Sequence, residues 1–126
     1  PYGLRELLAR VRALLRRAYG ELATENSLLY AADLAIDLAR AQVSRGSEVL
    51  ALTPTEFRLL VYLVQNAHQA LTRSQILAAV WGHDADIEDE RMVNVQIRRL
   101  REKIEVDPSH PTLILTVPGT GYRFAG

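Results

Sequence analysis

Residues 91–105 read RMVNVQIRRLREKIE, a segment crowded with arginine in a chain of 126 residues whose formal net charge is zero. On a helical wheel of about 100° per residue, Val93, Ile97, Leu100 and Ile104 fall on one narrow apolar stripe. A stripe of this kind packs on a core and turns the rest of the helix outward. We therefore expect an amphipathic helix with a basic outer face.

The outer face of this helix suits double-stranded DNA. It carries Arg91, Met92, Val95, Arg98, Arg99 and Glu102. Guanidinium groups reach phosphates or guanine edges, and a β-branched apolar residue such as Val95 suits a thymine methyl group. Taken alone, a charged helix face is more often simply solvated. The elements around the helix decide between the two interpretations.

Charges are segregated on either side of residue 90. Residues 91–104 hold five basic groups and one acidic group, a balance of +4, whereas residues 83–90 hold five acidic groups and no basic one, a balance of −5. The acidic segment contains Asp84, Asp86, Glu88, Asp89 and Glu90. This pattern predicts two surfaces with different partners.

Two capping sequences precede the basic segment. TPTE at 53–56 is a capping box with proline at the first helical position, and it predicts a helix to about Gln65. TRSQ at 72–75 predicts a second helix that ends near Gly82. We expect the first helix to turn Phe57, Leu60, Val61 and Val64 inward, widened by Leu59 and Leu63, and the second to turn Ile76, Leu77 and Val80 inward. Asp89 is the expected cap of the third helix, which Asp107-Pro108 stops.

Strands are predicted at both ends of this helical region. Four short antiparallel strands are expected around residues 28–30, 34–36, 41–43 and 48–50, separated by turn-prone groups. Residues 112–117 and 122–124 flank Pro118-Gly119-Thr120-Gly121 and predict a hairpin. A capped helix, a loop, a basic helix and a hairpin follow one another as in a winged helix-turn-helix. The predicted class is therefore α+β.

The first twenty residues form a separate unit. Residues 3–19 repeat leucine at helical spacing with arginines between, which predicts one extra amphipathic helix. Residues 21–26 are polar and serve as a linker, so residues 27–126 form the main domain. Severed from its own core, the leucine stripe would need cover from another protomer or from the main domain.

Four segments resemble the C-terminal DNA-binding domain of OmpR/PhoB-type response regulators. They are LTPTEFRLLVYLVQNA at 52–67, LTRSQILAAVWG at 71–82, RMVNVQIRRLREKIE at 91–105 and ILTVPGTGYRF at 114–124. Residues 1–17 are similar to the last helix of the receiver domain of such regulators. The resemblance implies an N-terminal four-stranded sheet, three helices and a C-terminal hairpin wing. It also implies that the phosphate-accepting receiver domain lies upstream.

The resemblance assigns site residues by position. It implies DNA contacts by Arg91, Val95, Gln96, Arg98, Arg99 and Arg101 on the third helix, by Thr116 and Tyr122 at the wing, and by Trp81 near the DNA backbone. It implies that the loop with Asp84, Asp86, Glu88 and Asp89 meets RNA polymerase.

This sequence departs from the family pattern at three positions. Asn94 and Gln96 stand where the family commonly has Asp and His, so the preferred bases are expected to differ. Gln96 can bond adenine bidentately, which favours A·T pairs. Pro118 stands where the wing usually carries Arg, and it brings neither charge nor backbone donor. Contact of the wing tip with the minor groove should therefore be weak.

Other kinds of site find little support in the sequence. The chain has no cysteine, which excludes disulfides and cysteine-based zinc sites. A calcium loop in the acidic segment would need glycine at its sixth position, where Asp89 stands. The three histidines lack catalytic partners, and no apolar stretch approaches the roughly 20 residues that span a membrane. We expect no catalytic residue, metal or cofactor, and a cytoplasmic setting.

The sequence thus predicts a sequence-specific DNA-binding effector domain of a two-component system. The expected partners are duplex DNA, RNA polymerase, and a histidine kinase that acts on the receiver domain. Residues 26–126 hold ten basic and twelve acidic groups, a balance of −2, which predicts weak non-specific binding and a homodimer on repeated half-sites. The alternative is a winged-helix protein-interaction module whose basic face meets an acidic partner.

Overall fold

Capping sequences fix where two helices begin in the computed structural model, which describes residues 27–82 and 90–126. Helix α3 spans Pro54–Gln65, and the Thr53 hydroxyl accepts from the Glu56 N–H while the Glu56 carboxylate accepts from the Thr53 N–H. Helix α4 spans Arg73–Trp81 and begins with the same reciprocal pair between Thr72 and Gln75. Both predicted helix starts are confirmed. Each box satisfies two backbone donors that the first helical turn leaves unpaired.

The basic segment is helix α5, Glu90–Ile104. Val93, Ile97, Leu100 and Ile104 are each at most 1% exposed, which confirms the predicted stripe. Burial of such side chains contributes about 1.5–3 kcal/mol each, so the stripe is a main reason why α5 holds its position. The predicted cap Asp89 lies outside the described residues.

The N-terminal sheet is antiparallel with strand order β1-β2-β3-β4. The strands are β1 Leu28–Ala31, β2 Leu34–Asp37, β3 Gln42–Arg45 and β4 Glu48–Leu50. The register aligns Leu29, Ile36, Val43 and Leu50 in one row across the sheet, with the two central residues buried. The four predicted strands are confirmed, and β3 begins one residue later than its predicted run.

The second sheet joins the predicted hairpin to a strand that the sequence did not reveal. Its order is β5-β7-β6, with β5 Leu71–Thr72, β6 Ile114–Val117 and β7 Gly121–Phe124. At Gly121 an added Cβ would lie 2.1 Å from the carbonyl oxygen of Leu71, so this close approach of β7 to β5 requires glycine. A two-residue strand has almost no periodic signal, which explains why β5 was missed.

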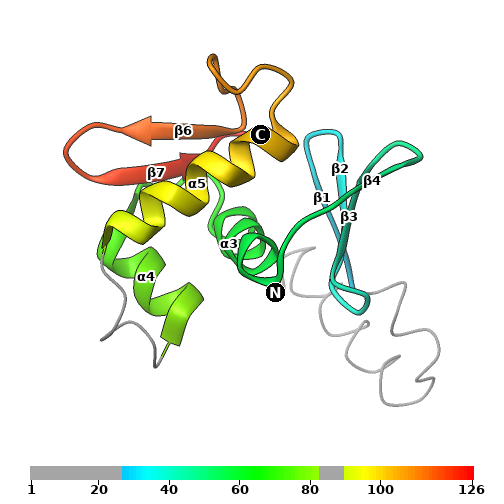
Figure 1. Ribbon diagram of the computed structural model, residues 1–126, viewed down its shortest axis with the longest axis horizontal. Coiled ribbons are helices and arrows are strands. Elements are labelled where there is room, and N and C mark those ends of the chain that lie inside the picture. Colours follow the sequence, from blue (N-terminus) through cyan, green and yellow to red (C-terminus); the bar gives the residue numbers. More distant parts are fainter. Residues whose placement is uncertain (1–26, 83–89) are drawn as a thin grey trace, which may run out of the picture.

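Helix α3 lies between the N-terminal sheet on one side and α4, α5 and the hairpin on the other (Figure 1). Leu59, Leu60 and Leu63 are fully buried, and they join one hydrophobic cluster with residues of both sheets and of α4 and α5. The sequence centred the inward face on Phe57, Leu60, Val61 and Val64, and of these only Leu60 is buried. Because α3 is covered from two sides, its most buried residues include Leu59 and Leu63, which were expected only to widen the inward face.

The predicted helix at residues 3–19 and the predicted linker lie outside the described residues. No helix within residues 27–82 and 90–126 has the length and apolar character needed to span a membrane.

Candidate nucleic-acid interface

The outer face of α5 is exposed and cationic. Arg91, Asn94, Val95, Arg98 and Arg99 are all exposed, and the side chain of Arg98 is 83% exposed. Arg98 Nε lies 3.5 Å from Glu102 Oε1, one turn along the helix. Exposed pairs at this spacing contribute only about 0.3–0.5 kcal/mol, so Arg98 can exchange this carboxylate for a phosphate or base at little loss. Val95, 38% exposed, lies between the arginines as predicted.

Gln96 does not lie on this face. Helix α5 packs against both α3 and α4, so the side of the helix that carries Gln96 is covered as well as the apolar stripe. The side chain is 8% exposed, and its Oε1 is buried without a hydrogen-bond partner among the described residues. The side chain is thus largely covered by the neighbouring helices, and the predicted contact between Gln96 and adenine stays a prediction.

Arg101 faces the wing. Its Nε and Nη2 donate to the carbonyl oxygen of Ile114 at 3.1 and 2.8 Å, and Nη2 also donates to Thr116 Oγ1 at 3.0 Å. The hydroxyl of Thr116, a predicted DNA contact, is therefore already one of its partners. Arg101 stabilises the position of β6 against α5.

A second set of contacts joins α4, α5 and β7. The Tyr122 hydroxyl donates to Asn94 Oδ1 at 2.6 Å, and Arg73 Nε donates to the same oxygen at 2.8 Å. The guanidinium carbons of Arg73 and Arg101 each lie 5.5 Å from the centre of the Tyr122 ring, within cation–π range. We call Arg73, Asn94, Arg101 and Tyr122 the Asn94 cluster. Tyr122, a predicted DNA contact, is only 6% exposed.

Arg73 belongs to this cluster, although its position in the sequence predicted only that it follows a helix cap. It lies 21 residues before Asn94 in the chain. Its position at the first residue of α4, which faces the start of α5, is the signal that would have found it.

The C-terminal end of α5 is held by ionic contacts. Lys103 donates to Glu56, whose side chain is 1% exposed, and the Thr53 N–H bonds the same carboxylate oxygen. Burial raises the pKa of Glu56, but the hydrogen bonds from Lys103 and Thr53 outweigh it, and the pKa lies below its ordinary value. Glu56 is therefore ionised at neutral pH and anchors α5 to the start of α3.

Of the remaining residues singled out in the sequence, some lie in the described part of the structure and others do not. Trp81 is half-buried and packs against the hydrophobic cluster at the end of α4. Pro118 is exposed in the wing turn. Asp84, Asp86, Glu88 and Asp89, the predicted polymerase-contact residues, lie outside the described residues.

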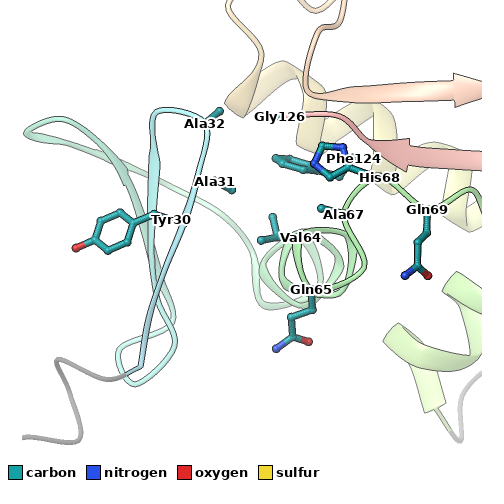
Figure 2. Close-up of a pocket in the computed structure, with 10 residues that line it drawn as sticks. All are labelled: Tyr30, Ala31, Ala32, Val64, Gln65, Ala67, His68, Gln69, Phe124 and Gly126. Carbon is teal, nitrogen blue, oxygen red and sulfur yellow. The ribbon is translucent and has the colours of Figure 1, made fainter. Parts of the chain in front are cut away.

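A hollow of about 430 Å³ lies between β1, the end of α3 and the C-terminal strand, on the N-terminal-sheet side of α3 (Figure 2). Its lining includes Ala31, Val64, Ala67, His68 and Phe124, while the Tyr30 hydroxyl points away. No side-chain carboxylate, amine or guanidinium lines it, so the hollow presents no pair of groups for acid–base chemistry. Within the described ranges, no group of three His, Cys, Asp or Glu side chains is arranged to hold a metal ion.

Residues 46–124 match the family described as "Transcriptional regulatory protein, C terminal". The chain belongs to this family. It is the C-terminal domain type of OmpR/PhoB regulators, and the residues matched run from the turn that precedes β4 to the end of β7. The family is one of transcriptional regulators rather than a class of enzymes.

Response regulators are among the relatives of this domain. The chain is 47% identical over 125 residues to the DNA-binding response regulator MtrA of Mycolicibacterium paratuberculosis, covering 98% of this chain and 53% of that protein. It is 41% identical over 124 residues to the KDP operon transcriptional regulatory protein KdpE of Escherichia coli, covering 98% and 54%. The chain thus spans about half the length of the curated relatives it matches.

Solved structures agree with the family. The RstA DNA-binding domain of Klebsiella pneumoniae, in complex with the RstA box, is 36% identical with a TM-score of 0.69, over 78% of this chain and 96% of that chain. The response regulator DrrB of Thermotoga maritima, an OmpR/PhoB homologue, is 34% identical with a TM-score of 0.73, over 100% of this chain and 54% of that chain. The winged-helix architecture predicted from the sequence is confirmed.

Proposed function

We propose that the chain binds double-stranded DNA sequence-specifically, as the effector domain of a two-component response regulator that controls transcription. The observation that carries the proposal is the outer face of α5, where arginines are exposed opposite a fully buried stripe. The likeness to a domain described in complex with the RstA box supports it. Helix α5 would enter the major groove and the hairpin would lie beside the adjacent backbone.

Roles follow from the chemistry of each exposed group. Arg91, Arg98 and Arg99 would contact phosphates or guanine edges, and Val95 would contact a thymine methyl group. Phosphate contacts supply affinity and base contacts supply selectivity. Thr116 and Trp81 would lie near the DNA backbone, at the wing and at the end of α4 respectively.

The partners beyond DNA belong to the same proposal. Residues 26–126 carry a balance of −2, which favours weak non-specific binding and two protomers on repeated half-sites. The acidic residues 84–89 would be repelled by phosphates and so would face RNA polymerase. A histidine kinase would act on a receiver domain joined through residues 1–26, and the setting would be cytoplasmic.

Replacing both Arg98 and Arg99 with Ala tests the proposal. Each arginine contact with a base edge contributes about 1–3 kcal/mol, and each 1.4 kcal/mol is about tenfold. Specific affinity, measured by fluorescence anisotropy on a duplex selected from a random pool, should fall about a hundredfold. The urea midpoint should stay unchanged because both side chains are exposed.

The matched control is Arg40→Ala with Arg58→Ala. These two exposed arginines lie on the β2–β3 turn and on α3, and the control removes the same charge. Its affinity should remain within about threefold of the parent, since charge far from the groove acts only through a screened field. The proposal would be contradicted if both double variants lost the same amount of DNA affinity. It would also be contradicted if the affinity of the wild type did not change with salt concentration.

A further inference from the structure

We propose that Asn94 is a positioning residue that holds the wing and α4 against α5, rather than a residue that contacts a base. The inference rests on the proposed function and assigns a task to the one exposed amide on the outer face of α5. Asn94 stands on the same face as Val95 and Arg98, where a base contact would otherwise be the natural assignment.

The oxygen of Asn94 is fully used within the protein. An amide oxygen has two lone pairs, and Oδ1 accepts from Arg73 Nε at 2.8 Å and from the Tyr122 hydroxyl at 2.6 Å. Asparagine bonds adenine bidentately only when this oxygen is free to accept from the adenine amino group. In the observed geometry Asn94 cannot make that contact.

The two donors come from elements far apart in the sequence. Arg73 is the first residue of α4, and Tyr122 lies on β7, 28 residues after Asn94. Asn94 therefore connects α4, α5 and the wing through a single atom. On the other strand of the wing, Arg101 holds the Ile114 carbonyl and Thr116, which is paired with Tyr122 in the hairpin register. Both strands of the wing are thus attached to α5.

Attachment of this kind fixes the wing before DNA arrives. A hairpin that is already oriented loses less conformational freedom on binding, so more of the contact energy appears as affinity. The gain comes from geometry and not from a contact to a base. Loss of the attachment should therefore weaken binding to every site in proportion and leave base preference unchanged.

The cluster also has an unusual charge balance. It brings two guanidinium groups to one phenol ring, and the shared acceptor is a neutral amide. No carboxylate within residues 27–82 and 90–126 forms an ion pair with Arg73 or Arg101. Asn94→Asp would keep both acceptor bonds and remove one unit of positive charge beside the proposed DNA face.

A double-mutant cycle of Asn94→Ala and Tyr122→Phe tests the proposal. Both single variants lose the hydrogen bond between Tyr122 and Asn94, and Asn94→Ala also loses the bond from Arg73. Each should weaken specific affinity by about tenfold or more, and the double variant should be no more than about threefold weaker than Asn94→Ala. Duplexes selected from a random pool by Asn94→Ala should have the wild-type consensus. A changed base at one position in that selection, with Tyr122→Phe unchanged, would show that Asn94 reads DNA and would overturn the proposal.

Asn94→Asp provides the rescue. Hydrogen exchange of the amides in residues 114–124 should be as slow in Asn94→Asp as in the wild type, and faster in Asn94→Ala and Tyr122→Phe. This measurement needs no DNA. If the wild type binds no duplex, the proposed function fails, while the exchange pattern still decides whether Asn94 holds the wing. Unchanged exchange in Asn94→Ala would overturn the positioning role.

Discussion

The two ends of α5 are built for different tasks. The last turn, residues 101–104, and Glu105 after it are held from several sides, whereas the first ten residues present most of their charged side chains to solvent. Figure 1 shows the last turn directed towards the N-terminal sheet and the first turn beside α4. One end of a single helix is thus anchored, and the other is left available to a partner.

One contact at the anchored end satisfies a carbonyl group that any helix leaves unpaired, and a second set of contacts joins this end to the start of the hairpin. Arg45 donates to the carbonyl oxygen of Ile104, one of the last carbonyls of α5. Glu105, 6% exposed, accepts from the N–H groups of Thr112, Leu113 and Ile114 at 2.9–3.1 Å. Polar and ionic contacts thus hold the last turn, whereas the first ten residues are held by the buried Val93 and Ile97, and their outward charged side chains can be changed with little loss of stability.

The largest expected effect is at the Glu56–Lys103 pair. Lys103→Met removes the cation and leaves a buried carboxylate with fewer partners. Breaking a buried pair from one side costs about 3–5 kcal/mol, and because the Lys103 side chain is 35% exposed we expect the lower figure, about 3 kcal/mol. Urea denaturation measures the loss.

The double variant Glu56→Gln with Lys103→Met is the control for this prediction. It removes the buried charge together with its partner, so it should be more stable than Lys103→Met alone. A double variant that is less stable than the single one would contradict the account. The folded fraction of Lys103→Met should keep its DNA affinity, in contrast to the Arg98 and Arg99 variant, which should lose affinity and keep stability.

A smaller effect is expected at Glu105. Glu105→Gln keeps the shape but replaces one acceptor oxygen with an NH₂ group that faces backbone donors. Loss of a charged hydrogen bond costs about 1.5–3 kcal/mol, and we expect about 2 kcal/mol in the free energy of unfolding. The exposed Glu102→Gln serves as the comparison and should change stability by less than about 0.5 kcal/mol. Equal losses at the two positions would refute the distinction between the ends of α5.

The smallest effect is the response to mild acid. The pKa of Glu56 is depressed in the folded protein, so its contribution is present above the unfolded pKa and is lost as pH falls through the folded pKa. Stability should begin to fall below about pH 4.5. Urea titrations at several pH values should show a shallower fall in Glu56→Gln with Lys103→Met. Asp107, whose pKa the Ser109 and His110 hydrogen bonds lower, titrates in both proteins. If the free energy of unfolding falls equally steeply with pH in the two proteins, Glu56 is not the cause of the loss of stability in acid.

Much of the fold was predictable because its signals are local. The capping boxes at Thr53 and Thr72 act between residues three apart, so the sequence contains both partners. The apolar stripe of α5 repeats at helical spacing for the same reason. The predicted hairpin and N-terminal strands followed from turn residues that interrupt short apolar runs.

The candidate site was predicted less completely. Val95, Arg98 and Arg99 lie on the exposed face as expected, but Gln96 and Tyr122 are both buried, and Arg101 bonds the wing. A helical wheel gives the direction of each side chain around the helix axis, but it does not show which neighbouring elements cover that side of the helix. The positions of α4 and the hairpin decide that.

Local sequence patterns specify where α3 and α4 begin, which stripe of α5 is buried and that its outer face is cationic, since these properties depend on residues within a few turns of one another. The packing of distant elements specifies which outward residues stay available. The partners of Asn94 lie 21 and 28 residues away, and the Arg45 that holds Ile104 lies 59 residues away. Contacts at such separations form only when the packed core brings the elements together, and no local pattern specifies them.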